Sequence, residues 1–349
     1  GTGTQQAIIS SDSHVIEDPD LWVKRLPQAF RDRAPEFPPL TAGGHFQGVG
    51  GGNDPHKRID EMAVDGVSAE VLYASFQLTL YQLKDAALQE ACFRVYNDWL
   101  AEYCSVAPDR LIGVAGISLY DVNQGVEELK RSRKMGLRGA LIWLVPHPDL
   151  PFTSDHYERF WAAAQDLEMP VSLHTSSGFG HDNVDVRGMV GAQDQPAWLR
   201  SRRPIYVTAD IERTFFDIVV SGVLRRYPRL KLILTETNFG WIPYFLQSVD
   251  ATVQRWRKSA DKDLLPIDEL PSDYFRRQMY ATFMVDRAGS QALSWWGEDN
   301  IMWSSDFPHH STTWPNSRQV IAAQLGHLKP ETHAKIVHDN VNALYGLGL

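Results

Sequence analysis

The segment AIISSDSHVIED (residues 7–18) begins with a short apolar run and passes directly into a polar stretch. The run at 7–10 is typical of a buried β-strand. A dinucleotide-binding open sheet would follow such a strand with the glycine fingerprint G-x-G-x-x-G, but the residues that follow here are DSHVIED. This first unit therefore disfavours a doubly wound open sheet relative to a (β/α)8 barrel.

Beyond this segment, apolar runs alternate with amphipathic stretches of helical length. We predict strands at 7–10, 69–73, 111–116, 139–144, 170–174, 230–235, 278–283 and 300–305. We predict helices at 85–106, 122–135, 155–168, 207–226, 240–257, 286–296 and 315–326, with short helices near 330–337 and 339–345. Strands that alternate with helices are typical of parallel βαβ units. The pattern predicts a single α/β domain over residues 1–349, a (β/α)8 TIM barrel with residues 1–5 as a flexible tail.

The composition of the 349 residues is that of a globular protein, with 43% hydrophobic and 22% charged residues. No apolar run reaches the roughly 18 residues that cross a bilayer, and no secretory signal is visible at the start. A net charge of −9 argues against a nucleic-acid partner, because such binding needs clustered Lys and Arg. We therefore expect a cytoplasmic protein with neither a membrane nor a nucleic-acid partner.

The two cysteines, Cys92 and Cys104, both lie in the predicted helix at 85–106. Twelve residues of helix rise about 18 Å, which is too far for a disulfide bond. We expect two buried or half-buried free thiols, as is usual in a reducing cytoplasm.

Metal-binding side chains recur at the ends of four predicted strands. Asp12 and His14 follow the first strand, His174 ends the fifth, Glu236 follows the sixth and Asp306 follows the eighth. A barrel enzyme carries its catalytic groups at the C-terminal ends of its strands, which meet at one rim. Imidazole and carboxylate together bind divalent first-row metals. The sequence therefore predicts a metal site there, with Asp306 as a ligand or as the base that takes a proton from bound water.

Each of these residues also has a purely structural interpretation. Asp12 could form a turn, and His174 could be a hydrogen-bonded core histidine. Glu236 could cap the helix that begins near residue 240, and His309 and His310 could be solvated loop residues. The common position at strand ends favours a metal site over coincidence.

Two segments are longer than ordinary connections. The first, at 17–57, follows the first strand and contains the Gly-rich stretch 43–52, and the second, at 175–206, follows the fifth strand. Long loops in compact domains commonly serve as lids or binding segments. We therefore expect His181, Arg187 and the Gly-rich stretch to take part in substrate binding or gating.

Two tryptophans are placed to line a substrate pocket, because Trp143 ends the fourth predicted strand and Trp241 follows the sixth. Arg138 precedes the fourth strand, at the opposite end of the barrel. We expect it to form a structural ion pair there.

Seven stretches of the chain occur in the order in which one known family carries them: DSHVIEDPDLW (12–22), RIDEMAVDGVSAEVLY (58–73), YNDWLAEYCSVAPDRLIGVA (96–115), MGLRGALI (135–142), PVSLHTSSG (170–178), VVSGVLRRYPRLKLILTETNFGWIPYFL (219–246) and WSSDFPHHSTTWPNS (303–317). Through them the chain resembles the amidohydrolase-related family, the branch of the amidohydrolase superfamily with aminocarboxymuconate semialdehyde and γ-resorcylate decarboxylases. The resemblance implies a barrel whose metal is bound by Asp12, His14, His174 and Asp306. It also implies a homodimer.

The chain departs from the family pattern in ways that affect the metal. Many superfamily members begin with His-x-His, whereas this chain has Asp12-Ser13-His14. Relatives that decarboxylate aromatic acids carry a catalytic His where this chain has Glu236, and no Lys or Glu ends the fourth strand to act as a bridging ligand. More oxygen ligands favour Mn or Fe over Zn. We expect one or two divalent ions per chain, with Fe or Mn favoured and Zn possible.

Two enzymatic functions are compatible with these residues. The first is a metal-dependent hydrolase or non-oxidative decarboxylase that acts on a small carboxylated or cyclic organic substrate, with Asp306, Glu236 and His309 as its catalytic residues. The second is a dinuclear iron or iron–manganese oxygenase, which the family resemblance also allows, with Glu236 and His309 holding a second metal. A third interpretation, a barrel without chemistry, predicts no bound metal.

Overall fold

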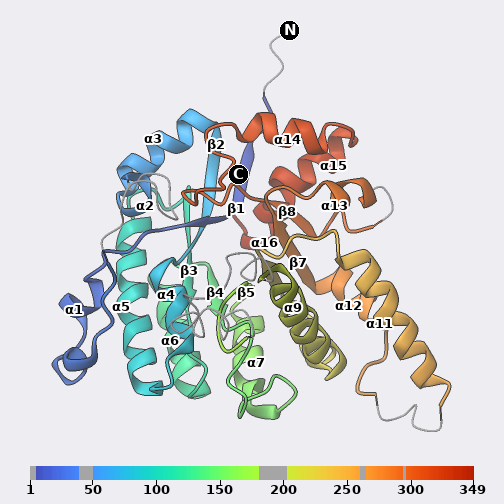
Figure 1. Cartoon of the computed structure of the whole chain (residues 1–349), viewed down its shortest axis with the longest axis horizontal. Coiled ribbons are helices and arrows are strands. Elements are labelled where there is room, and N and C mark those ends of the chain that lie inside the picture. Colours follow the sequence, from blue (N-terminus) through green and yellow to red (C-terminus); the bar gives the residue numbers. More distant parts are fainter. Residues whose placement is uncertain (1–4, 39–49, 181–202, 260–264, 294–295) are drawn as a thin grey trace, which may run out of the picture.

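The structure is a computed structural model that describes residues 5–38, 50–180, 203–259, 265–293 and 296–349. Within these residues, parallel strands form a single eight-stranded sheet in chain order. The strands are β1 (Ile8–His14), β2 (Val67–Tyr73), β3 (Leu111–Gly116), β4 (Gly139–Ile142), β5 (Val171–His174), β6 (Leu232–Thr235), β7 (Met279–Phe283) and β8 (Ile301–Trp303). Helices surround the strands (Figure 1). The (β/α)8 TIM barrel predicted from the sequence is confirmed.

The main helices form where the amphipathic pattern predicted them. They are α5 (Ala86–Cys104), α6 (Val122–Lys134), α7 (Glu158–Asp166), α9 (Arg203–Val220), α10 (Val223–Arg226), α11 (Ile242–Arg257), α13 (Arg287–Ala292) and α14 (Ser317–Leu325). Side-chain caps fix several of their beginnings, because Asp85 accepts from the amide of Leu88 and Asp121 from that of Gln124. The chain closes with α15 (Pro330–Ala334), a π-helical turn (Lys335–Asp339) and α16 (Asn340–Tyr345).

The segment after β1 contains helices that the sequence analysis did not predict. They are α1 (Leu21–Arg25), a 3-10 turn (Gln28–Arg33), α2 (Gly50–Asn53) and α3 (Pro55–Asp65), followed after β2 by α4 (Phe76–Thr79). The start of α3 has a clear signal, because Asp54 caps it and Pro55 occupies its first turn. Further on, α12 (Pro271–Gln278) also begins with a proline. The helix α3 begins inside the segment 17–57, which was interpreted as a connection, and α12 has only eight residues.

The Gly-rich stretch is partly helical where it is described. A side chain on Gly51 would place its Cβ 2.7 Å from the Cα of Arg58, so only glycine allows α2 to pack this closely on α3. The close packing presents the Gly51 carbonyl to the side chain of Arg58, which donates to it at 3.0 Å. Residues 43–49 lie outside the described residues.

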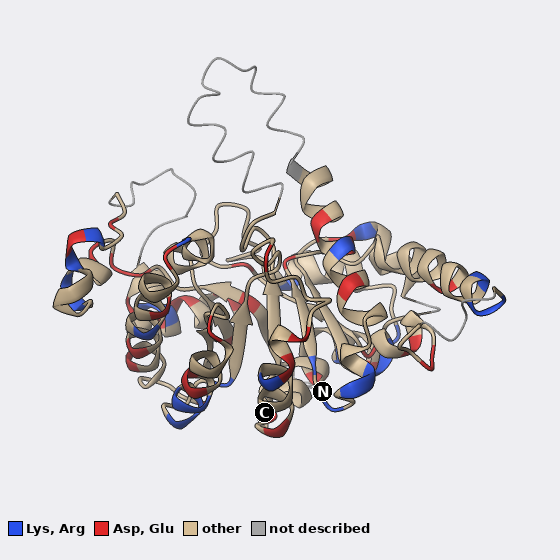
Figure 2. Cartoon of the chain, turned by 90° about the horizontal axis from the view of Figure 1, so that it is seen from below, with Lys and Arg blue, Asp and Glu red and all other residues tan. Residues whose placement is uncertain are grey.

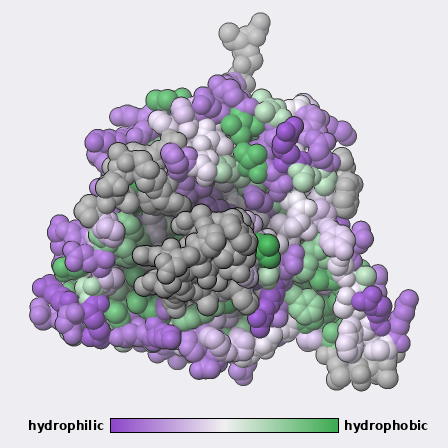
Figure 3. Space-filling model, in the orientation of Figure 1, coloured by the Kyte–Doolittle hydropathy of each residue, from purple (hydrophilic) through white to green (hydrophobic). Residues whose placement is uncertain are grey.

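The sheet is buried along its whole length, and side chains from β1, β3, β4, β5, β6 and β8 are buried at every strand position. On the face shown in Figure 3, hydrophilic side chains occupy much of the outer margin. Cys92 and Cys104 are buried free thiols, as predicted, and burial raises the pKa of each to about 12. None of the helices in the described part of the chain has the length and apolar character to cross a membrane.

Candidate metal centre

The two ends of the sheet meet where β1 and the segment after β8 exchange backbone hydrogen bonds. The amide of Asp306 donates to the carbonyl of Asp12 at 3.0 Å, and the amide of His14 donates to the carbonyl of Phe307 at 2.7 Å. Alternate residues of a strand point to the same side, so Asp12 and His14 share one face of β1. Residues almost three hundred positions apart in the chain are thereby brought together at the barrel's C-terminal rim.

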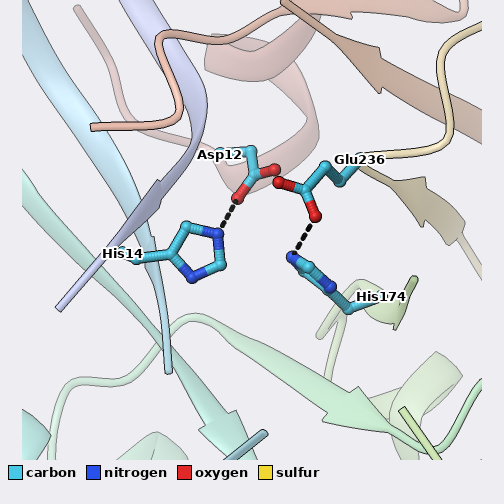
Figure 4. Close-up of side chains that lie close together, drawn as sticks. All are labelled: Asp12, His14, His174 and Glu236. Atoms are coloured by element: carbon cyan, nitrogen blue, oxygen red, sulfur yellow. Dashed lines mark ion pairs between the residues drawn. The ribbon is translucent and has the colours of Figure 1, made fainter. Parts of the chain in front are cut away.

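Strands β5 and β6, which pair with each other, supply the other side of the site. His174 is the last residue of β5, and Glu236 directly follows β6. Its carboxylate Oε2 lies 3.6 Å from His174 Nε2 and accepts a hydrogen bond from Thr175 Oγ1 at 3.0 Å. The side chains of Asp12, His14, His174 and Glu236 point toward one another (Figure 4). Ligand atoms from these four residues all lie within 4.8 Å of each other.

Backbone carbonyls orient both imidazole rings. His14 Nδ1 lies 2.8 Å from the carbonyl of Ala74, and His174 Nδ1 lies 2.8 Å from the carbonyl of Thr175. A carbonyl can only accept, so each Nδ1 carries the proton and each Nε2 presents a lone pair to the centre. This arrangement is the usual one for a metal-binding histidine, whose other nitrogen donates to a carbonyl or carboxylate.

Acceptor atoms therefore face one another at the centre without a donor between them. His14 Nε2 lies 3.4 Å from Asp12 Oδ1 and 3.1 Å from Asp306 Oδ1. Within the described residues, the buried atoms that have no hydrogen-bond partner include Asp12 Oδ1, Asp12 Oδ2, His14 Nε2, His174 Nε2 and Asp306 Oδ1. Such groups cost free energy unless something satisfies them. A divalent cation fits this kind of donor set, because it would neutralise carboxylates and accept lone pairs from oxygen and nitrogen.

The pKa values of the side chains also reflect the crowding of carboxylates at the centre. Burial, together with the charges of Asp306 and Glu236, raises the pKa of Asp12 well above its ordinary value. Burial and the Glu236 charge also raise the pKa of Asp306, to about 7. Burial lowers the pKa of His14 to about 3, so this imidazole is neutral near neutral pH. A bound cation would reverse the carboxylate shifts by favouring their charged forms.

His309 adds a second layer to the site. Its ring stacks on that of His14 with the centroids 4.2 Å apart, and its Nδ1 lies 2.9 Å from Asp306 Oδ2 and 3.7 Å from Glu236 Oε1. Burial opposes the charge, but the two carboxylates raise the pKa of His309 to about 10. His14, Glu236, Asp306 and His309 form a second group of ligand atoms within 4.8 Å of one another. The position between His309, Asp306 and Glu236 is therefore suited to a proton or a cation.

Glu236 and Asp306 both have left-handed backbone conformations, with φ of 62° and 54°. This region is uncommon for residues other than glycine and tends to occur at functional sites. Burial opposes the charge of Glu236, but His174 and His309 hold its pKa well below the ordinary value. With its side chain 32% exposed, Glu236 lies at the mouth of the site.

Two supporting residues were missed in the sequence. Arg58 of α3 is fully buried, and its guanidinium donates to the carbonyl of His14 and to Glu70. Nothing in RIDEM distinguishes such an arginine from an exposed one. Tyr73 lies beneath the site, with its ring centroid 5.6 Å from that of His174 and its hydroxyl 2.8 Å from Ser172 Oγ. Tyr73 ends the second predicted strand, the same position that pointed to the metal ligands, so its place was available as a signal.

Of the four residues predicted to bind substrate, the two that the structure describes are not among the residues that surround the proposed metal position. Trp143 is 1% exposed, and its indole donates to Tyr157 Oη at 3.1 Å. Trp241 is half-buried and donates to the carbonyl of Thr237 at 2.9 Å. His181 and Arg187 lie outside the described residues. The roles of these four in substrate binding stay predictions. His310 is exposed, as expected of a solvated loop residue.

Within the described part of the chain, Arg138 does not form the ion pair that was expected of it. Arg138 donates instead to the backbone carbonyl of Gly346 at 3.3 Å. Gly346 directly follows the last helix, α16, and its backbone carbonyl accepts the hydrogen bond for which a carboxylate was expected.

A family model described as amidohydrolase matches residues 31–347. A γ-resorcylate decarboxylase of Rhizobium sp. (strain MTP-10005) is 27% identical over 65% of this chain and 70% of its own length. A γ-resorcylate decarboxylase of Polaromonas sp. (strain JS666) is 26% identical over 76% of this chain and 82% of its own length.

Solved structures share the fold. A dihydroxybenzoic acid decarboxylase from Polaromonas sp. JS666, with bound manganese and the inhibitor 2-nitroresorcinol, has a TM-score of 0.74 at 22% identity, over 99% of this chain and 98% of that one. A 5-carboxyvanillate decarboxylase from Sphingomonas paucimobilis has a TM-score of 0.71 at 20% identity, over 98% of this chain and 99% of that one. At these identities the likeness shows the barrel alone.

Proposed function

The chain belongs to the amidohydrolase family, and from that premise we propose that it is a metal-dependent, non-oxidative decarboxylase of a small aromatic or other cyclic carboxylic acid. The observation that carries this proposal is the set of buried, unpartnered acceptor atoms that converge at the rim. The γ-resorcylate decarboxylases among its relatives support the reaction class. The manganese in the Polaromonas structure supports a divalent cation.

The proposed metal ligands are Asp12, His14, His174 and Asp306, with Glu236 as a further ligand. When bound, the cation would supply a Lewis acid that holds the substrate's carboxylate oxygens. His14 and His174 present neutral lone pairs, since their Nδ1 protons are committed to backbone carbonyls. The carboxylate-rich ligand set favours manganese or iron over zinc.

The chain's own groups can provide the proton that decarboxylation requires. The bond between the ring carbon and the carboxylate breaks, CO2 leaves, and the electron pair on the ring carbon takes a proton. Asp306 can relay that proton through Oδ2, which is hydrogen-bonded to His309, while its Oδ1 faces His14 Nε2 at 3.1 Å. His309, which is hydrogen-bonded to Asp306 Oδ2, can then restore the proton.

The carboxylate at position 236 distinguishes this chain from the aromatic-acid decarboxylases that it resembles, which carry a histidine there. A second carboxylate near the substrate would repel its anionic group unless a cation lies between them. Glu236 therefore acts through the metal, and the chain uses Asp306 and His309 for proton transfer.

Isotope labelling tests the reaction class. Manganese-loaded protein is incubated in D2O with a panel of hydroxybenzoates and cyclic carboxylic acids. Decarboxylation predicts CO2 release and one deuterium on the carbon that lost it. Hydrolysis by the same site would instead place 18O from labelled water in the product. If 18O enters the product and no CO2 is released, the reaction is a hydrolysis and the proposed decarboxylase is wrong.

A second candidate is a dinuclear iron or iron–manganese oxygenase, for which His14, Glu236, Asp306 and His309 would provide a second ligand group. Elemental analysis and assays without oxygen decide between the candidates. Two ions per chain and an activity that needs dioxygen would support the oxygenase. If the protein binds one ion per chain and is fully active without oxygen, the oxygenase is excluded and the decarboxylase is supported.

A further inference from the structure

A cavity of about 610 Å³ opens at the end of the barrel opposite the metal centre. Its walls include the residues immediately before three strands: Arg138 before β4, Pro170 before β5 and Lys231 before β6. Because all strands are parallel, these residues lie at the N-terminal rim. The cavity is therefore separate from the site described above.

Cationic side chains dominate the walls of this cavity. The charged residues that line it are Arg133, Arg138, Arg229, Lys231 and one acid, Glu168. The whole chain carries a net charge of −9, so this local excess of positive charge runs against the overall balance. Stretches of Lys and Arg lie along the edge of the molecule that carries the C-terminus (Figure 2).

The ion pairs of the described residues leave most of this charge uncompensated. Neither Arg133 nor Arg138 forms an ion pair with a described carboxylate, and Lys231 Nζ donates to the backbone carbonyl of Arg277 at 2.8 Å. Only Arg229 has an acidic partner, Asp166 at 3.4 Å, and that pair is exposed. Burial and the nearby Arg277 lower the pKa of Lys231, which is consistent with a shortage of negative charge around it.

The remaining wall is an ordered part of the fold. Tyr345 of α16 is buried beside Tyr73 and Ser172 inside the barrel. The carbonyl of Gly346 accepts from Arg138 at 3.3 Å. The cavity is thus held in shape by the closing helix.

We propose that this cavity is a binding site for a small organic polyanion, such as a phosphorylated or polycarboxylated metabolite, held by Arg133, Arg138, Arg229 and Lys231. Guanidinium groups match carboxylate and phosphate oxygens in a two-pronged geometry. The volume falls in the range of about 300–1,000 Å³ that is typical of small-molecule sites. It exceeds the need of a single inorganic ion, which points to an organic ligand.

Calorimetric titration of the metal-loaded protein tests this site, with 3-phosphoglycerate, inorganic phosphate and succinate as probes. The first probe carries both anionic groups, and the other two identify which group is recognised. The test variant is Arg133→Gln/Arg229→Gln. The matched control is Lys130→Gln/Arg225→Gln, which removes two exposed cations on the same helix α6 and the nearby helix α10 but outside the cavity walls.

We expect saturable binding of 3-phosphoglycerate that weakens about tenfold or more in the test variant and changes less than about twofold in the control. Binding of phosphate or succinate with the same dependence on the variants also supports the site. Equal affinity in wild type and test variant would mean that the anion binds elsewhere, for instance at the metal, and would overturn the proposal. Equal losses in both double variants, or no saturable binding up to ~10 mM, would overturn it too. Arg133→Gln alone serves as the test if the double variant melts early.

Discussion

The amide of Asp306 donates to the carbonyl of Asp12 at 3.0 Å, and this bond joins the segment after the last strand to the first strand at the level of the proposed metal. Two carboxylates are thereby held side by side although like charges repel. Burial raises the pKa of both, together with the charges of Asp306 and Glu236 for Asp12 and the charge of Glu236 for Asp306. A fold keeps such a pair only where a cation or a proton compensates it.

Removal of one carboxylate should weaken metal binding selectively. Asp12→Asn keeps the shape of the side chain but removes its charge, and we expect manganese affinity to fall by about 100-fold or more, because even supporting residues of metal sites contribute about 10–100-fold. Asp60→Asn, on the exposed face of α3, is the matched control and should bind as the wild type does. Calorimetric manganese titration measures both. If Asp12→Asn binds manganese with wild-type affinity, Asp12 is not a metal ligand.

Glu236 should act through the cation rather than as a free acid or base. Glu236→Gln should raise the manganese dissociation constant, and added manganese should restore much of the activity. Thr175→Val, which removes the hydrogen bond to Glu236 Oε2, should show a smaller change in the same direction. Activity measured against manganese concentration provides the readout. A loss of activity that saturating manganese leaves untouched would instead give Glu236 a direct chemical role.

Arg58 should stabilise the fold beneath the site. Its buried guanidinium bonds to Glu70 and to the carbonyl of His14, so Arg58→Met leaves a buried carboxylate without a partner. We expect a loss of about 3–5 kcal/mol in the free energy of unfolding. The double variant Arg58→Met/Glu70→Met should lose less, because it buries no unpaired charge. Urea unfolding compares the variants, and equal losses in the single and double variants would contradict this account.

Metal-dependent stability should increase with pH. In chelator-treated protein, environment raises the pKa of Asp306 from 3.8 to about 7. A raised carboxyl pKa stabilises the fold below its unfolded value, and this contribution is lost as the pH rises through about 7. A cation prefers the deprotonated ligands and compensates for the loss. The difference in melting temperature between manganese-loaded and chelator-treated protein should therefore widen from about pH 5.5 to about pH 8. A difference in melting temperature that stays constant over this pH range would contradict the prediction.

The fold was predictable because each strand is an apolar run next to a helix of clear period, and all eight predicted strands occur. The helices α3 and α12 were not predicted, because α3 begins inside a segment interpreted as a connection and α12 has only eight residues. The grouping of Asp12, His14, His174 and Glu236 followed from their common place at strand ends, whereas Asp306 is grouped with His14, Glu236 and His309.

Other features depended on long-range packing. The stacking of His309 on His14 arises from a loop whose path no local pattern specifies. The role of Arg58 beneath His14 depends on the close contact of α2 and α3, and the partner of Arg138 comes from the last helix. Such contacts join segments that are far apart in the chain, so propensity and spacing could not reveal them.

The most direct test of the metal centre is anomalous diffraction at the manganese absorption edge from crystals of the manganese-loaded protein. The account predicts a strong peak at the C-terminal rim, within coordination distance of Asp12, His14, His174 and Asp306. An additional peak beside His309 would show that the second ligand group is occupied as well. Well-ordered crystals with no anomalous peak among these residues, or with manganese bound only elsewhere, would contradict it.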